Sequence, residues 1–316
     1  MKLDTIIDRA LSRRTFLAGA GSVAATTLVI GCGDDGAKMP PTSTGVTDAD
    51  ILNFALNLEY LEAEFYLHAA TGSGLASADA GSNPGTVTGG TKVAGLAPAQ
   101  QNILNEIAYD EQEHVRFLRS ALGSAAVARP AIDLTNSFNA LASAAKIAST
   151  FNPFDNYDDF LLGAFIFEDV GVTAYNGAAP LISTAGIKAG YLSAAAGIMA
   201  VEAYHAAYVR TTITANATTK GSSNYPQFGY ANLVSALRAS VGGGAETMLT
   251  VPTGTTTPAT TVTPTSVVAA DNNALAYSRT TDQVLHIVYG TGGGSGVKSG
   301  AFFPNGLNGA IAVTQS

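Results

Sequence analysis

Four glutamates of this chain lie where helical periodicity predicts apolar side chains. At about 100° per residue, each falls within a stripe of Leu, Ile, Val, Ala and Tyr residues, and two are followed one turn later by a histidine. The six residues are Glu59, Glu111, His114, Glu168, Glu202 and His205. A lone carboxylate is costly to bury, so four of them require a shared cationic partner. Lys188, the one base near a stripe, lies roughly 20 Å from Glu202 along its helix, and a pair of metal ions is the simplest partner.

The spacing of the two histidines supports metal binding. Residues at i and i+3 project from one helix face, so Glu111 with His114, and Glu202 with His205, can each reach one cation. Four glutamates and two histidines, with two glutamates bridging, form the ligand set of the di-iron and di-manganese carboxylate bundles. The order Glu, Glu-x-x-His, Glu, Glu-x-x-His also indicates a repeat with a pseudo-two-fold axis. We therefore predict a site for two redox-active ions, iron in preference to manganese.

Three further residues are candidates for a supporting role around these ligands. Tyr66 follows Glu59 by seven residues, and Tyr175 follows Glu168 by the same distance. This repeat selects Glu59 over Glu62 as the ligand of the first helix. A phenol one or two turns from a buried carboxylate often hydrogen-bonds it, and the alternative for both tyrosines is a role as core aromatics. Glu62 is interpreted as a supporting or partly exposed carboxylate.

Other acidic and histidine side chains are predicted to lie outside the site. Glu64 and Glu113 point away from their stripes and are expected to be solvated, and His68 is expected on the surface. His286 is interpreted as a packing residue of a C-terminal helix.

The elements that must position the ligands are helices. Periodicity predicts four long ones, with a short helix in the link between the second and third, and the composition shifts to Thr, Gly, Ser and Pro after Ala215. We expect an all-α four-helix bundle over residues 49–213 with one long crossover connection, and a mostly irregular C-terminal extension over 214–316 packed on it. The predicted helices span residues 51–70, 98–122, 140–149, 157–178, 188–212, 230–240 and 281–289.

Three segments of the chain resemble a known family. Asn57–Tyr66 is similar to the first helix of exported ferritin-like domain proteins related to plant desiccation-related proteins. Ala276–Leu285 and Phe302–Gly309 resemble the C-terminal signature of the same proteins. The resemblance covers residues 48–316 and implies the ferritin-like fold, with every ligand position of the superfamily pattern filled.

The N-terminus resembles a bacterial export signal. Ser12–Leu17 contains Arg13-Arg14 and precedes an apolar run that is too short to span a membrane as a helix, as in twin-arginine signals. The run ends in Val29–Cys32, which resembles a lipoprotein cleavage site. We expect residues 1–31 to be a signal peptide, Cys32 to carry lipid, and residues 32–48 to be a flexible tether. The mature protein would then be anchored in the periplasm or cell envelope, beyond the bacterial inner membrane.

Composition excludes several classes of function. Sixteen Lys and Arg against 24 Asp and Glu give a net charge of −8, which disfavours a nucleic-acid partner because a phosphate backbone requires a basic face. A single cysteine excludes an internal disulfide framework and a cysteine-rich metal site.

Three hypotheses follow for the function. The first is an oxidoreductase in which two metal ions act on O2 or a peroxide, or on ferrous iron, in oxidative or desiccation stress. The second is a non-catalytic stress-protection or structural protein whose metal ions stabilise the bundle. The third, iron storage in a closed shell, fits poorly with a lipid tether and a C-terminal extension. The sequence leaves open the substrate, the electron donor and whether the chain is a monomer or a homodimer.

Overall fold

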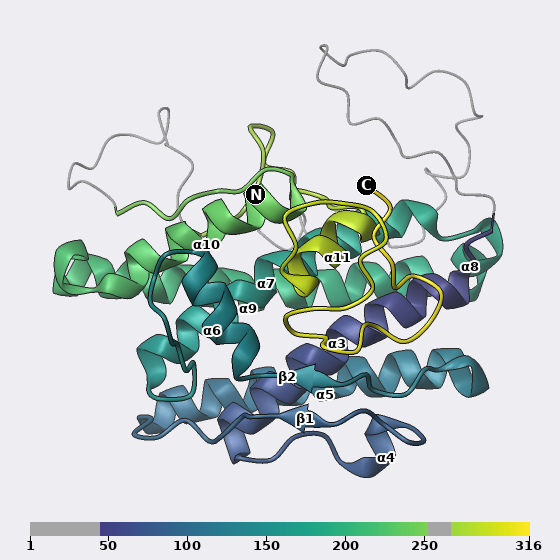
Figure 1. The fold of residues 1–316 in the computed structure, drawn as a ribbon, viewed down its shortest axis with the longest axis horizontal. Helices are drawn as coiled ribbons and strands as arrows, with labels where there is room; N and C mark the ends of the chain where they lie inside the picture. The colour runs from purple at the N-terminus through teal and green to yellow at the C-terminus, as the bar shows by residue number, and fades with distance from the viewer. Residues whose placement is uncertain (1–44, 252–266) are drawn as a thin grey trace, which may run out of the picture. The chain divides into compact units, whose positions relative to one another are not determined.

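The computed structural model describes residues 45–251 and 267–316, and this part of the chain is all-α, as predicted (Figure 1). The signal-like segment 1–31, Cys32 and most of the tether lie outside the described residues. A two-residue parallel pair, Val87–Thr88 (β1) with Ile132–Asp133 (β2), joins the two links on either side of the second long helix. The helices are α3 (Asp48–Thr71), α4 (Ser77–Ala80), α5 (Pro98–Leu122), α6 (Asn136–Ala144), α7 (Tyr157–Ala178), α8 (Thr184–Ala189), α9 (Tyr191–Lys220), α10 (Pro226–Gly242) and α11 (Thr281–Tyr289).

Local sequence signals set the starts of the main helices. Thr47 caps α3 and Asn156 caps α7, each accepting a hydrogen bond from a backbone N–H of the first turn. Pro98 opens α5, where its missing N–H costs nothing. Thr280 and Gln283 form a reciprocal capping box that opens α11.

Four long helices form the bundle that carries the predicted ligands. α3 packs along α5, and α7 packs along α9, while α3 also contacts α7 in the centre. α5 and α9 touch only sparsely, so the bundle is two helix pairs joined mainly through α3 and α7. The core is one continuous cluster rich in aromatic residues from α3 and α7, including Phe65, Phe160 and Phe167.

The fourth long helix differs from its predicted bounds at both ends. It begins at Tyr191 rather than residue 188, because Gly190 has φ 92° and its left-handed backbone separates α8 from α9. It continues to Lys220, past the compositional change at Ala215, because Ile213 and Ala217 are buried in the core. Tertiary packing here outweighs the weak helix propensity of the Thr-rich sequence.

The C-terminal extension is held against the bundle by apolar packing and buried ion pairs. Val284 and Leu285 of α11 are buried, and α10 packs on α7 and α11. Asp169 of α7 accepts hydrogen bonds from Arg210 at 2.7 Å and Arg238 at 3.0 Å. Glu246 accepts from Arg238 and Arg279, both at 2.7 Å, so each of these carboxylates faces two guanidinium groups.

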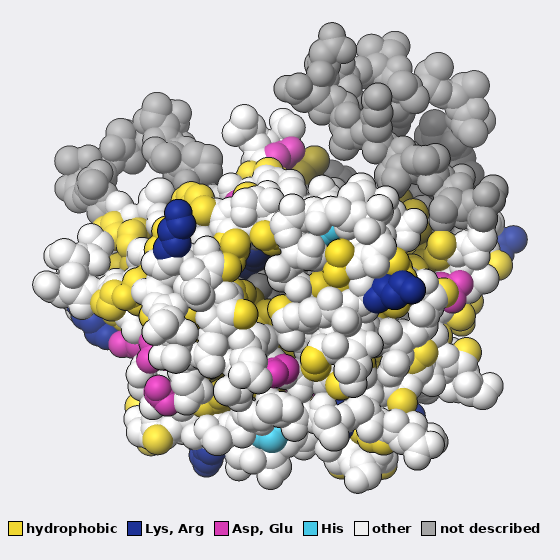
Figure 2. All heavy atoms as spheres, viewed as in Figure 1, with side chains coloured by type: hydrophobic (Ala, Val, Ile, Leu, Met, Phe, Trp, Pro, Cys, Tyr) yellow, Lys and Arg dark blue, Asp and Glu magenta, His cyan; other side chains and the backbone are white. Residues whose placement is uncertain are grey.

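The first and last segments of the family resemblance lie against each other. The Asn57 side chain donates to the Asn308 carbonyl at 2.8 Å and accepts from its N–H at 3.0 Å. On the face shown in Figure 2, charged side chains are few and scattered among the described residues. Within residues 45–251 and 267–316, no helix is both long enough and apolar enough to cross a membrane.

Candidate metal centre

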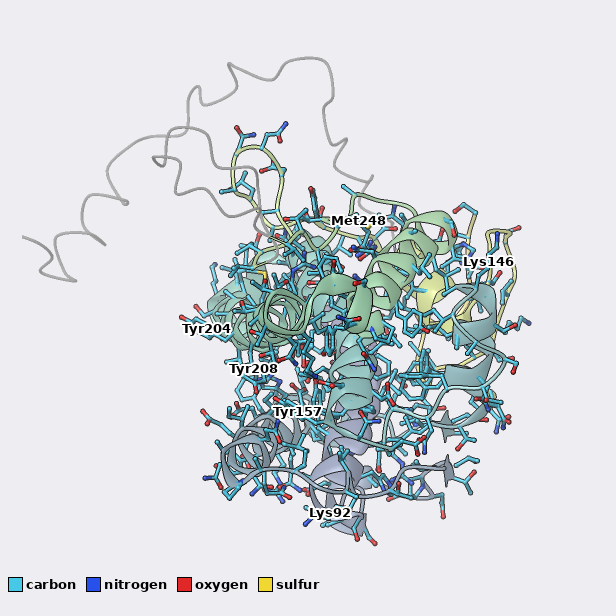
Figure 3. The ribbon with its side chains drawn as sticks, turned by 90° about the vertical axis from the view of Figure 1, so that its left-hand side faces the viewer. Lys92, Lys146, Tyr157, Tyr204, Tyr208 and Met248 are labelled. Atoms are coloured by element: carbon cyan, nitrogen blue, oxygen red, sulfur yellow. The ribbon has the colours of Figure 1, made fainter. Side chains whose placement is uncertain are left out.

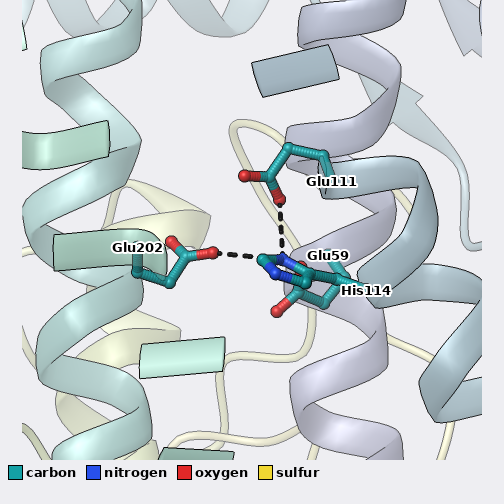
Figure 4. A group of neighbouring side chains, drawn as sticks. All are labelled: Glu59, Glu111, His114 and Glu202. Carbon is teal, nitrogen blue, oxygen red and sulfur yellow. Dashed lines mark hydrogen bonds and ion pairs between the residues drawn. The ribbon is translucent and has the colours of Figure 1, made fainter. Parts of the chain in front are cut away.

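The structure brings all six residues of the predicted ligand set together inside the bundle. They form two groups that share Glu111: one of four side chains and one of three, with the ligand atoms of each group within 4.8 Å of one another. Figure 4 shows the first group, with Glu59 from α3, Glu111 and His114 from α5, and Glu202 from α9. The second group joins Glu111 with Glu168 from α7 and His205 from α9.

His114 faces three carboxylates from three helices. Its Nδ1 atom lies 3.1 Å from Glu59 Oε2, 3.4 Å from Glu111 Oε2 and 3.5 Å from Glu202 Oε1. The glutamates are completely buried and the imidazole is 8% exposed. A nitrogen lone pair and three carboxylate oxygens therefore converge on one small volume, which is the donor set that iron and manganese accept.

His205 occupies the corresponding place in the second group and has an additional partner. Its Nδ1 atom lies 3.0 Å from Glu111 Oε1 and 3.7 Å from Glu168 Oε2. Its Nε2 atom lies 3.2 Å from Asp110 Oδ2 at the edge of α5. A carboxylate on the outer ring nitrogen fixes the orientation of the imidazole and leaves Nδ1 free to bind a metal ion.

Tyr66 and Tyr175 are buried and each donates a hydrogen bond to a glutamate of the other helix. Tyr66 of α3 donates to Glu168 of α7, and Tyr175 of α7 donates to Glu59 of α3. The two pairs cross between α3 and α7, as a pseudo-two-fold axis requires. Each phenol thus orients one of the two lone glutamates.

Glu62 is a fifth buried carboxylate at this centre, and Gly171 makes room beside it. Glu62 is 5% exposed and belongs to neither ligand group. A Cβ atom at Gly171 would lie 2.2 Å from Glu202 Oε2 and 3.3 Å from Glu62 Oε1. The absence of a side chain at Gly171 therefore leaves the space into which the Glu202 carboxylate projects.

Orphaned polar atoms show that these residues fit metal ions. Both carboxylate oxygens of Glu111 and of Glu202, one oxygen of Glu168 and Nδ1 of His205 are buried without a hydrogen-bond partner among the described residues. Buried polar atoms are almost always satisfied, and these point into the shared volume between four helices. Cations bound there would satisfy them all.

The charges of the centre are strongly coupled. Burial raises the pKa of Glu59, Glu62 and Glu168. Burial and the charge of Glu111 raise the pKa of Glu202 to about 8. Burial opposes ionisation of Glu111 too, but His114 and His205 lower its pKa to about 2.

The pKa values of the two histidines are raised, whereas burial alone lowers the pKa of an imidazole. Burial lowers the pKa of His205, yet Glu168, Asp110 and Glu111 together raise it to about 11. The pKa of His114 is also raised, because Glu59, Glu111 and Glu202 outweigh the effect of burial. Without metal ions, protons on the imidazoles and on several carboxyls neutralise the cluster.

The prediction for Glu64 is wrong, and the other residues set aside have varied surroundings. Glu64 is 1% exposed, because Arg129 from the long α5–α7 link covers it with an ion pair and the Leu75 N–H donates to it. Glu113 is half-exposed and pairs with Arg116. His68 is only partly exposed and lies 3.5 Å from Glu64, while His286 is buried under the C-terminal residues.

Sequence reasoning missed two residues of the centre. Asp110 directly precedes the ligand Glu111, and this position next to a ligand was the available signal. In the structure it contacts His205 of α9. Gly171 lies one turn after Glu168, and a glycine inside a helix can mark the close approach of another group. Neither pattern points to its partner without knowing how α5, α7 and α9 pack.

This fold and this cluster agree with the comparisons to known proteins. The chain belongs to the ferritin-like domain family, which matches residues 47–215, so the predicted membership of the ferritin-like superfamily is confirmed. It is 31% identical to the ferritin-like catalase Nec2 of Nesocodon mauritianus over 85% of this chain and 87% of that protein. It is 30% identical to the desiccation-related protein PCC13-62 of Craterostigma plantagineum over 76% of each. No solved structure matches the chain significantly.

The raised pKa values predict how stability depends on pH. Glu202 titrates near 4.5 when unfolded and near 8 when folded, so the metal-free folded state binds more protons between these values. Its free energy of unfolding should therefore fall as the pH rises from 4.5 to 8, and Glu59, Glu62 and Glu168 act in the same direction. Metal binding requires deprotonated ligands and strengthens as the pH rises, so the metal-loaded protein should not show this fall. Urea unfolding with and without metal measures both, and a metal-free stability that rises across this window would contradict the assignment.

Gly171→Ala should separate metal binding from folding. The added methyl group displaces the Glu202 carboxylate, so metal affinity should drop by about 10–100-fold, a loss typical of a disturbed metal site. Alanine favours a helix over glycine by about 1 kcal/mol, so the fold should persist. Gly197→Ala, on α9 with nothing within 4 Å of its Cβ atom, is the matched control. Competition with a chelator measures the affinities, and equal values for the two variants would refute the role of Gly171.

Proposed function

We propose that this protein is a two-metal oxidoreductase that consumes hydrogen peroxide by a catalase-like reaction. One observation carries the proposal: two groups of buried Glu and His ligands share Glu111, so two ions bound there would be adjacent. The name of the relative from Nesocodon mauritianus adds support. The carboxylate-rich ligands suit both iron and manganese. We keep iron as the expected metal.

In this reaction two molecules of hydrogen peroxide give one O2 and two water molecules. Two redox-active ions would supply two electrons to one peroxide molecule and recover them from the next. The chain provides the fixed geometry. Glu111 lies between the two groups, Asp110 orients His205, and Tyr66 and Tyr175 orient Glu168 and Glu59.

Two features of the chain suit a small, uncharged substrate. His114 and His205 are the ligands with the most exposure, at 8% and 6%, and both belong to the sparsely packed α5–α9 side. Peroxide could reach the ions there without unfolding a helix pair. Glu62 is buried beside the ligand groups and makes no hydrogen bond to another described residue. Its carboxyl group is therefore placed to hydrogen-bond a small polar substrate at the ions.

A second candidate function is a stress-protection protein whose metal ions only hold the bundle together. The relative named as a desiccation-related protein favours it. So does the energetic need for cations among the buried carboxylates, which exists whether or not the ions turn over.

We also propose that the protein works outside the bacterial inner membrane, attached by lipid at Cys32. The twin-arginine run and the lipobox-like Val29–Cys32 support this proposal. A peroxide-consuming centre at that location would meet oxidants before they enter the cell.

The function is tested by oxygen release from hydrogen peroxide. The metal-loaded wild type should release one O2 per two peroxide molecules consumed. Glu111→Gln removes the shared carboxylate and should lower metal content and oxygen release by about a hundredfold or more. Glu113→Gln, a half-exposed position on the same helix, is the control and should match the wild type. A wild type that binds metal but neither consumes peroxide nor oxidises ferrous iron would favour the stress-protection function instead.

A further inference from the structure

A row of aromatic side chains leads from the metal centre to the partly exposed side of α7 and α9. Tyr66 donates to the metal ligand Glu168, and its ring lies edge-on to Phe160 at a centroid distance of 5.8 Å. Phe160 stacks with Tyr157 at 6.1 Å. The hydroxyl of Tyr157 is hydrogen-bonded to that of Tyr208 on α9. We call Tyr66, Phe160, Tyr157 and Tyr208 the aromatic ladder.

The outer end of the aromatic ladder is accessible to small molecules. Tyr157 and Tyr208 are each partly exposed. Figure 3 shows both on the same side of the structure as Tyr204, which lies one turn before Tyr208 on α9 and is 75% exposed. The inner end, Tyr66, is completely buried. The ladder therefore connects the buried centre with solvent.

The chemistry of the ladder suits single-electron transfer. The chain has no tryptophan and 12 tyrosines, so phenols are its most readily oxidised aromatic groups. A phenol that loses an electron must also lose its hydroxyl proton. Glu168 lies ready to accept that proton from Tyr66, and the outer phenols can release theirs to solvent.

The pseudo-two-fold partner of Tyr66 has no such connection. Tyr175 is also buried and also donates to a ligand, Glu59. Among the described residues, no aromatic ring contacts Tyr175, whereas Tyr66 contacts both Phe65 and Phe160. Both tyrosines orient a ligand in the same way. That role does not explain why only Tyr66 has aromatic neighbours that continue toward the surface.

We propose that the aromatic ladder carries single oxidising equivalents from the metal centre to a small reductant at Tyr157 and Tyr208. The inference rests on the proposed function, because peroxide is the oxidant. Tyr66 gives one electron to the oxidised centre and its proton to Glu168. An electron from the outer pair restores Tyr66, Glu168 returns the proton, and the outer pair releases one proton to solvent. The resulting phenoxyl takes a hydrogen atom from an external phenol or thiol, so the route discharges equivalents that would otherwise damage the ligands.

The test maps where radicals form in the metal-loaded protein. Hydrogen peroxide is added with a nitroso spin trap, and mass spectrometry locates the adducts. The wild type should carry adducts on Tyr157 or Tyr208, and Tyr66→Phe should lose them. Tyr230→Phe, which removes the hydroxyl of a partly exposed tyrosine on α10 outside both the ladder and the metal centre, should keep them. Tyr157→Phe tests the outer step away from the metal ligands and should lose the Tyr208 adduct while its metal content stays at the wild-type level.

Each other outcome overturns the inference. Adducts that persist in both Tyr66→Phe and Tyr157→Phe, or that fall on Tyr109, which is 59% exposed and outside the ladder, would show attack from solvent instead. A wild type that consumes peroxide without adducts on the outer pair overturns the inference and leaves the proposed function standing. A metal-loaded wild type that does not consume peroxide overturns both.

Discussion

The centre of the bundle buries more carboxylates than the cationic side chains beside them can neutralise, and the rest of the structure depends on this imbalance. Five glutamates meet two histidines in the centre of the bundle, and even two imidazolium ions would leave a net negative charge. The five are Glu59, Glu62, Glu111, Glu168 and Glu202. Protons or metal ions must supply the balance. The unpartnered oxygens, the space at Gly171 and the crossed phenols of Tyr66 and Tyr175 are all arranged around that requirement.

The same bundle shows how the chain treats buried carboxylates that need no metal. Asp169, next to Glu168 on α7, is paired with Arg210 and Arg238, and Glu246 is paired with Arg238 and Arg279. Of these ion pairs, the one between Arg238 and Asp169 joins the C-terminal extension to the bundle. The two ligand groups consist of glutamates and histidines. The charge of Asp169 is thus balanced by arginines, whereas the adjacent Glu168 lies among glutamates and a histidine and needs protons or metal ions.

Much of this could be predicted from the sequence because the decisive signals are local. Helical periodicity predicted the all-α fold and placed the four glutamates in apolar stripes, and the i, i+3 spacing added the two histidines. Contacts between distant segments could not be predicted. Glu64 is buried because Arg129 reaches it from the long link, and α9 extends to Lys220 because its last turns pack on the core. The role of Asp110 could not be predicted because its partner His205 lies on another helix, α9.

Metal analysis combined with anomalous diffraction tests most directly whether cations neutralise the carboxylates of this centre. Protein purified with its native metal should contain two ions per chain. Anomalous peaks should lie between His114 and His205, about 3.5–4 Å apart as in other two-metal sites. A folded, fully active protein that holds no ion there, or holds its metal elsewhere, would contradict the account.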